Sequence, residues 1–335
     1  MKNQIGSRNL RPSRRTMAMA AAVLALAGTA VATAPTASAG ASGPAAPPRP
    51  LLGREQQVRA YWTRSRMEHA IQLGPLGAPL GSTRTPRAAS TTSAARESGA
   101  GGIRTPRTVG KLFFSDAQND YVCSASAIRT RSRDQVLTAG HCVHTGPNPD
   151  DLGIPLLDSL LSRPHYFSDW MFVPRYYRGR APLGKWVATN RYVSSGWTQH
   201  ENFSQDQAIL TMGRRKGKRL VDVTGGDRLA LGKGPNQGHV RIWGWPAESP
   251  YNGRVAWRCD GRTTETNVDW PGDARMSCPL NGGASGGPWL LRGRRTANTG
   301  TIFAVTSREA ASGTKELLAQ PLPRELRTLI RRAGG

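Results

Sequence analysis

The sequence predicts an all-β fold, a sandwich or a barrel, over about residues 108–335. Short runs rich in β-branched and aromatic residues begin near Val109 and are separated by Gly, Pro, Asn and Asp. The runs are VGKLFF, YVCSASAI, QVLTA, KWVATNRYV, QAILTM, HVRIWGW, GRVAWRC, PWLLR and TIFAVTS. Many short strands at such spacing are typical of sandwiches and barrels.

The chain ends on a different pattern, LPRELRTLIRRA. Proline stands near its start, and Leu326, Leu329 and Ile330 fall on one face of a helix. This pattern predicts a terminal amphipathic helix over about residues 322–333.

Residues 1–39 have the three parts of a secretory signal peptide. The basic residues Lys2, Arg8, Arg11, Arg14 and Arg15 precede the apolar run MAMAAAVLALAGTAVATA. A small-residue cleavage site, Ala37-Ser38-Ala39, follows. We therefore expect an extracellular protein with no membrane span once the signal is removed. The pair Arg14-Arg15 leaves open whether export follows the general or the twin-arginine route.

Residues 40–107 are rich in Ala, Pro, Ser, Thr, Gly and Arg. Only the stretch at residues 54–73, REQQVRAYWTRSRMEHAIQL, is able to form a helix. A segment of this composition buries little apolar surface, so it is interpreted as a pro-segment or a low-complexity linker. The active protein is then expected to derive from a zymogen.

The net charge of +24 at pH 7 at first suggests nucleic acid as a partner. Half of this excess lies in residues 1–107, which contain 15 Lys and Arg against 3 Asp and Glu. The remaining chain shows no recognisable nucleic-acid module with interleaved aromatic residues. We expect no specific nucleic-acid binding, but loose association with anionic surfaces such as cell-wall polymers.

Four cysteines in an exported chain favour disulfides over a metal site, because none of them falls at the short spacing of zinc ligands. Three pairings are possible. The grouping along the chain suggests two local pairs, Cys123–Cys142 and Cys259–Cys278.

Three segments carry a histidine, an aspartate and a serine in positions suited to nucleophilic catalysis. His141 follows the strand QVLTA, Asp206 precedes the strand QAILTM, and Ser285 stands in the glycine-rich stretch GASGGPW. Serine becomes a good nucleophile when an imidazole takes its proton and a carboxylate orients the imidazole. Asp169 is the alternative acid. The backbone N–H groups of Gly283 and Ser285 would stabilise an oxyanion.

The motifs LTAGHC, DQAIL and GASGGP resemble the three catalytic motifs of the chymotrypsin-like serine proteases. VGKLFF, YVCSASAI and WGWP are closer to the bacterial glutamyl-endopeptidase-like branch. The resemblance covers about residues 108–335. It implies two antiparallel β-barrels, about 108–213 and 214–320, with a site between them. It also implies a secreted serine-type endopeptidase that acts on protein or peptide substrates, as a monomer and without a cofactor or metal.

The sequence departs from the family pattern at two places. Ala284 stands where many members have an aspartate that in some pairs with the new N-terminal amine. Pro279 stands where trypsin-type members have the aspartate that binds Lys or Arg. The resemblance places Thr306, Ser307 and Arg308 along the substrate pocket. Arg308 either reaches inward to pair with a substrate carboxylate or points into solvent beside a pocket for apolar side chains.

Two other function classes stay open at this point. One is a catalytically silent binding protein of the same fold, and the other is an esterase or amidase acting on small substrates. The complete set of His141, Asp206 and Ser285 favours a protease over the first of these.

Overall fold

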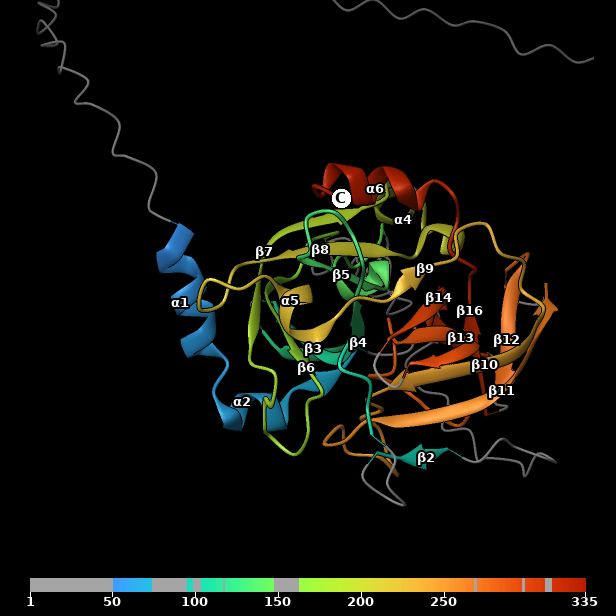
Figure 1. Ribbon diagram of the computed structural model, residues 1–335, viewed down its shortest axis with the longest axis horizontal. Coiled ribbons are helices and arrows are strands. Elements are labelled where there is room, and N and C mark those ends of the chain that lie inside the picture. Colours follow the sequence, from blue (N-terminus) through green and yellow to red (C-terminus); the bar gives the residue numbers. More distant parts are fainter. Residues whose placement is uncertain are drawn as a thin grey trace, which may run out of the picture. The chain divides into compact units, whose positions relative to one another are not determined.

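The computed structural model describes residues 51–73, 95–98, 104–116, 118–147, 163–267, 270–296, 299–310 and 315–335. The predicted signal peptide lies outside the described residues, as does part of the stretch interpreted as a pro-segment. Figure 1 shows the strands of residues 109–212 gathered in one sheet and those of residues 228–319 in another.

The first sheet closes into a barrel. Its six strands are β3 (Val109–Ser115), β4 (Asp120–Ala127), β5 (Gln135–Thr138), β6 (Ser168–Pro174), β7 (Trp186–Val193) and β8 (Ala208–Met212). They are antiparallel in the order β4-β3-β6-β7-β8-β5, and β4 pairs with β5 to join the ends. This last pairing involves only Ser126 and Ala127 of β4. The start of β4 is instead paired with a two-residue strand, β1 (Ile71–Gln72).

The second sheet is built mainly from six strands. They are β10 (Gln237–Gly244), β11 (Trp257–Thr266), β12 (Asp273–Ser277), β13 (Pro288–Thr296), β14 (Thr299–Val305) and β16 (Glu316–Ala319), in the order β16-β12-β11-β10-β13-β14. Three two-residue strands extend it: β2 (Arg96–Glu97), β9 (Arg228–Leu229) and β15 (Arg308–Glu309). An isolated bridge between Ala304 and Pro321 brings the chain after β16 against β14, so this sheet also curves back on itself. The all-β prediction is confirmed.

Few helices accompany the two sheets. They are α1 (Leu51–Tyr61), α2 (Arg64–His69), α4 (Ser195–His200), α5 (Leu220–Thr224) and α6 (Leu326–Arg332), with the 3-10 turns η2 (Gly140–Cys142) and η3 (Phe203–Gln205). Across the described ranges, none of the helices has the length and apolar character needed to cross a membrane.

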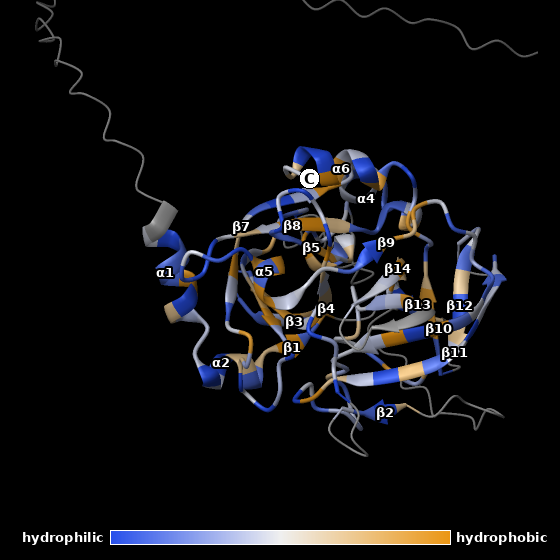
Figure 2. Ribbon diagram, viewed as in Figure 1, coloured by the Kyte–Doolittle hydropathy of each residue, from blue (hydrophilic) through white to orange (hydrophobic). Residues whose placement is uncertain are grey.

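The predicted C-terminal helix is confirmed as α6. Leu326 is buried, Leu329 and Ile330 pack against the same core, and hydrophilic residues alternate with them along the helix in Figure 2. The amide of Gln135 on β5 donates to the carbonyls of Ile330 and Ala333, each at 3.0 Å. Carbonyls at a helix C-terminus lack partners inside the helix, so this side chain from the first barrel satisfies them.

The stretch at residues 54–73 forms two short helices where the sequence suggested one. The break falls before α2, where the Thr63 hydroxyl accepts the Arg66 N–H at 3.2 Å and caps the helix. Contrary to the expectation that this region buries little apolar surface, Val58, Trp62 and Met67 are buried. Such a segment buries few apolar residues on its own, but here they complete a core that the barrel supplies.

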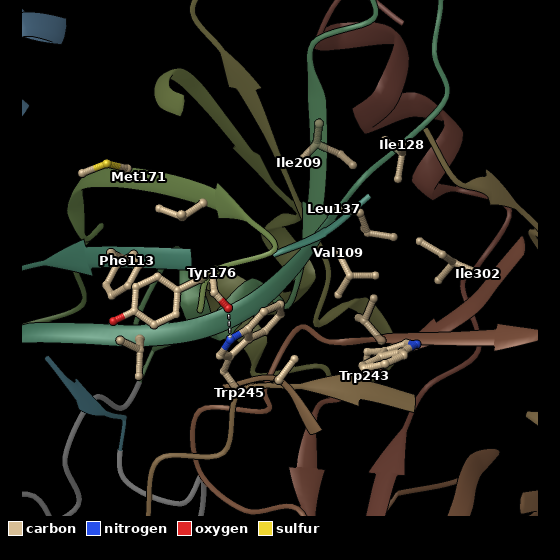
Figure 3. Packing of buried hydrophobic residues seen from close by; sticks show 14 of the residues in the cluster. Val109, Phe113, Ile128, Leu137, Met171, Tyr176, Ile209, Trp243, Trp245 and Ile302 are labelled. Carbon is tan, nitrogen blue, oxygen red and sulfur yellow. Dashed lines mark hydrogen bonds between the residues drawn. The ribbon is translucent and has the colours of Figure 1, made fainter. Parts of the chain in front are cut away.

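One apolar cluster connects the two sheets. Val109, Leu137 and Ile209 from the first sheet meet Trp243 and Ile302 from the second (Figure 3). A further hydrogen bond crosses this region, from the Trp245 indole N–H to the carbonyl of Tyr176 at 3.1 Å. The relation of the two sheets is therefore set by close packing of large side chains, which tolerates little displacement.

The buried carboxyl group of Asp227 should make stability depend on pH. Burial raises the pKa of Asp227 from 3.8 to about 6, although the Gly300 N–H donates to it at 2.7 Å. The folded state therefore holds a proton that the unfolded state releases, and stability is lost as the pH rises from about 4 to about 6. The expected loss is about 3 kcal/mol in free energy of unfolding.

Asp227→Asn lacks this titration and keeps the shape of the side chain. Urea unfolding measures the free energy of unfolding of both proteins at pH 4 and pH 7. Relative to the wild type, the variant should be more stable at pH 7 than at pH 4. A stability difference that is the same at both pH values would contradict the assignment.

Candidate active site

His141 lies in η2, one turn after β5 ends. The disulfide from Cys142 to Cys123 fixes this turn against β4. The second disulfide joins Cys259 and Cys278, so both predicted pairs are confirmed. The His141 side chain is only 3% exposed and its ring packs against Trp197, with the ring centroids 6.1 Å apart. The imidazole therefore has one orientation fixed by packing.

Asp206 follows η3 and directly faces His141, although 65 residues separate them in the sequence. Its Oδ1 accepts the backbone N–H of His141 at 2.8 Å, and its Oδ2 lies 2.9 Å from the ring Nδ1. The carboxylate thus holds both the backbone and the ring of the histidine. This contact favours the tautomer with the proton on Nδ1, which leaves Nε2 free to accept a proton.

A third group binds the same carboxylate from the second sheet. The Ser307 hydroxyl donates to Asp206 Oδ2 at 2.7 Å. The sequence placed Ser307 along the pocket, and its contact with Asp206 was not foreseen. Its neighbour Thr306 is also buried, and its hydroxyl accepts the Trp289 indole N–H at 2.9 Å. No motif marks these contacts, because they depend on how the two sheets meet.

The loop that carries Ser285 is anchored on the first barrel. The Ser124 N–H on β4 donates to the Ser285 carbonyl at 2.7 Å. A side chain at Gly286, where φ is +74°, would collide with the Thr138 hydroxyl and the Ser124 carbonyl, and Thr138 ends the strand before His141. The glycine therefore lets the serine loop approach the histidine segment closely. Ser285 itself is half-buried between buried neighbours.

Gly283 has a conformation that other residues rarely adopt. Its φ is +95°, and a Cβ atom there would stand 2.5 Å from the Trp245 carbonyl oxygen. The Ser124 hydroxyl accepts the Trp245 N–H and donates to the Gly283 carbonyl, each at 2.9 Å. Ser124 thus fixes the carbonyl side of Gly283, the residue whose N–H was predicted to stabilise an oxyanion. Sequence reasoning missed Ser124, since it lies within an ordinary strand.

The remaining pocket residues are placed as follows. Pro279 is half-buried. The Arg308 side chain is only 7% exposed, pairs with the buried Asp273 carboxylate, and stacks over the Phe203 ring, 4.4 Å from its centroid. Arg308 therefore does not point into solvent, which was one of the two alternatives for it. Its guanidinium is already engaged by a carboxylate of this chain.

Two carboxyl groups that the sequence did not single out flank Gly282, the residue before Gly283. Glu248 lies against Gly282, and Glu309 hydrogen-bonds to its backbone. Loss of hydration and the neighbouring Glu248 raise the pKa of the Glu309 carboxyl to about 7. The Glu309 carboxyl is therefore only partly ionised in neutral solution.

Other candidate residues lie apart from this arrangement. The Asp169 carboxylate accepts hydroxyls of Ser115 and Ser168, not a histidine. His165, His200 and His239 are exposed, as expected. His144 is buried, and its Nδ1 accepts the Gly146 N–H at 3.0 Å. Burial is the main cause that lowers the pKa of His144.

One group of potential metal ligands, Cys123, His141 and Cys142, is found among the described residues. Both cysteines are joined in the disulfide, so neither offers the thiolate that a metal requires.

No family model and no curated protein sequence matches this chain. Solved structures do match. Protease Anisep from Arthrobacter nicotinovorans is 27% identical, with a TM-score of 0.59, and the match covers 72% of this chain and 99% of Anisep. The thermostable serine protease AL20 from an extremophilic microorganism is 24% identical, with a TM-score of 0.59, over 68% of this chain and 97% of AL20.

A Glu endopeptidase in complex with MPD is 16% identical, with a TM-score of 0.53, over 71% of this chain and 95% of that one. The chain has the chymotrypsin-like fold. The resemblance indicated by the three sequence motifs is thereby confirmed. The likeness to Anisep, together with the paired His141 and Asp206, supports the class of serine-type endopeptidases.

The contact from Ser307 to Asp206 should matter for the orientation of the histidine. Ser307→Ala removes one charged hydrogen bond, and we expect kcat to fall about tenfold with KM nearly unchanged. Ser307→Thr keeps the hydroxyl and should restore most of the loss. Steady-state kinetics on a peptide substrate give both values. An equal fall in kcat in the Ala and Thr variants would mean that packing of the side chain, and not its hydroxyl, determines the effect.

Proposed function

We propose that this protein is a secreted serine endopeptidase with Ser285 as nucleophile, His141 as general base and Asp206 as the orienting carboxylate. The observation that carries the proposal is that the buried Asp206 carboxylate is hydrogen-bonded to both the backbone N–H and Nδ1 of His141. A carboxylate in that place fixes the tautomer needed for proton transfer at Nε2.

The reaction follows from these groups. Nε2 of His141 accepts the Ser285 hydroxyl proton as Oγ attacks the peptide carbonyl. The resulting oxyanion accepts hydrogen bonds from the backbone N–H groups of Gly283 and Ser285. When the C–N bond breaks, the leaving amine takes the proton from His141, and an acyl-enzyme remains. Water, deprotonated by the same histidine, then attacks the ester and releases Ser285.

Secretion is supported by the signal-like residues 1–39 and by two disulfides, which persist in oxidising compartments. We propose protein or peptide substrates, action as a monomer, and loose attachment to anionic polymers through the basic surface. The chemistry described needs no cofactor.

Substrate choice is proposed from the rim of the site. Arg308 is paired with Asp273, and the carboxyl groups of Glu248 and Glu309 already lie beside Gly282, where a further carboxylate is unfavourable. We therefore expect that glutamate is not the preferred residue at the attacked carbonyl. Matched peptides with Glu, Leu or Lys at that position measure this directly, and a clear preference for Glu would overturn it.

The triad roles are tested by substitution. Ser285→Ala and His141→Ala should each lower kcat by several orders of magnitude, with about 10³-fold acceleration over water remaining from the oxyanion donors and binding. Asp206→Asn should lose about 10⁴-fold, since it favours the wrong tautomer. Asp169→Asn is the matched control and should stay near wild type.

Hydrolysis of a fluorogenic peptide measures each rate, and circular dichroism checks the fold. Near wild-type cleavage by Ser285→Ala would exclude it as the nucleophile. Damage in Asp169→Asn with none in Asp206→Asn would mean that the acid is misassigned. Turnover of small esters without any cleavage of peptides would favour an esterase.

A further inference from the structure

The described helices that precede the barrels are docked on the first one. Trp62 is fully buried, and its indole N–H donates to the Asp169 carbonyl at 2.6 Å. Lys185 donates to the Trp62 carbonyl at 2.6 Å. Val58 and Met67 enter the same core. Helix α1 lies along the first barrel in Figure 1. Residues 51–73 are therefore held by both apolar and polar contacts.

A polar contact ties this segment to the beginning of β4. The carboxylate of Asp120, the first residue of β4, accepts the Tyr61 hydroxyl at 2.6 Å and the Arg66 Nε–H at 2.8 Å. The arginine also stacks on the tyrosine ring, 3.8 Å from its centroid. This contact aligns the chain that follows α2 with the edge of β4.

Strand β1 then occupies the edge of β4 beside the catalytic residues. Ile71 pairs with Tyr121 and Gln72 with Val122, in parallel. The next residue of β4 is Cys123, in the disulfide beside His141, and the one after it, Ser124, binds the Ser285 carbonyl.

The side chains of the same segment reach both borders of the site. Leu73 packs against the apolar cluster that contains Cys123 and Cys142. The Gln72 Cγ lies 2.7 Å from where a Cβ would stand on Gly282. The segment thus extends from the disulfide beside His141 to the residue before Gly283.

The chemistry of the proposed reaction indicates which part of the substrate would lie at the start of β4. The leaving amine takes its proton from His141, so the substrate residues that follow the cleaved bond must pass the histidine and its disulfide. An extended peptide on that side gains backbone hydrogen bonds from a free strand edge. The edge available there is the start of β4, and residues 71–73 already occupy it.

We propose that residues 51–73 form a built-in inhibitor that blocks the leaving-group side of the site. The inference rests on the proposed function. Helices α1 and α2 supply the attachment, and β1 competes with the substrate residues after the cleaved bond. Because the inhibitor is part of the same chain, its local concentration is high and weak strand pairing suffices. On this proposal, small acylating substrates still reach Ser285, which is partly exposed.

The test compares two substrates that share the same residues before the cleaved bond. One is an ester with a small alcohol as leaving group, and the other is a peptide with several residues after the bond. The full chain is compared with the double variant Ile71→Pro/Gln72→Pro, which removes both backbone donors of β1. Ile71→Ala/Gln72→Ala is the matched control, since it keeps those donors. Intact mass verifies that residues 51–73 remain attached in every sample.

We expect kcat/KM for the long peptide to rise about tenfold in the proline variant, the effect of losing weak strand pairing. The value for the ester should stay unchanged, and the alanine control should stay near wild type on both substrates. No rise on the long peptide, or an equal rise on both substrates, would overturn the proposal.

Asp120→Ala provides a second variant that weakens docking from the barrel side. It should raise kcat/KM for the long peptide and leave the value for the ester unchanged. This variant tests the proposal if the proline variant does not fold. A protein that cleaves both the ester and the peptide but shows no selective change contradicts the inhibitor alone. Failure of every variant to hydrolyse either substrate contradicts the proposed function itself.

Discussion

The carboxylate of Asp206 is the group on which the arrangement of the site depends. It is 1% exposed, and burial of a carboxylate is tolerated only when its oxygens receive hydrogen bonds. Two donors come from the His141 segment of the first barrel, and the third, Ser307, comes from the second sheet. A shift of one sheet against the other would remove the Ser307 hydrogen bond from this buried carboxylate. The requirement to satisfy it therefore links the packing of the sheets to the orientation of the histidine.

The same dependence on two sheets holds for the serine loop. Ser285 follows β12 in the chain, but its carbonyl accepts the backbone N–H of Ser124 in the first barrel. The Ser124 hydroxyl also donates to the Gly283 carbonyl. The large side chains between the sheets, Trp243 and Trp245 among them, make this junction rigid. Catalytic groups need positions fixed to fractions of an ångström, and the junction supplies that precision through packing rather than through either sheet alone.

The sequence was informative where local patterns decide the structure. The runs of β-branched and aromatic residues marked most strands, the spacing of Leu326 and Leu329 marked α6, and the local cysteine pairs were correct. Strand β6 was missed because SDWMFVP begins with polar residues and ends on a proline. Strands β12 (DARMS) and β16 (ELLA) were missed because they contain no β-branched or aromatic residue. The roles of Ser124 and Ser307 and the pairing of Arg308 with Asp273 depend on partners far along the chain. Burial of Trp62 was missed because its partners belong to the barrel, not to its own segment.

Trapping the nucleophile tests the central claim most directly. The full chain is treated with a fluorophosphonate, digested, and the modified peptide is sequenced by mass spectrometry. We expect one adduct, on Ser285 within the peptide that contains GASGGPW, and we expect its formation to be slowed strongly in His141→Ala and Asp206→Asn. An adduct on another hydroxyl, or peptide hydrolysis that continues with Ser285 fully blocked, would contradict the assignment of Ser285 as the nucleophile.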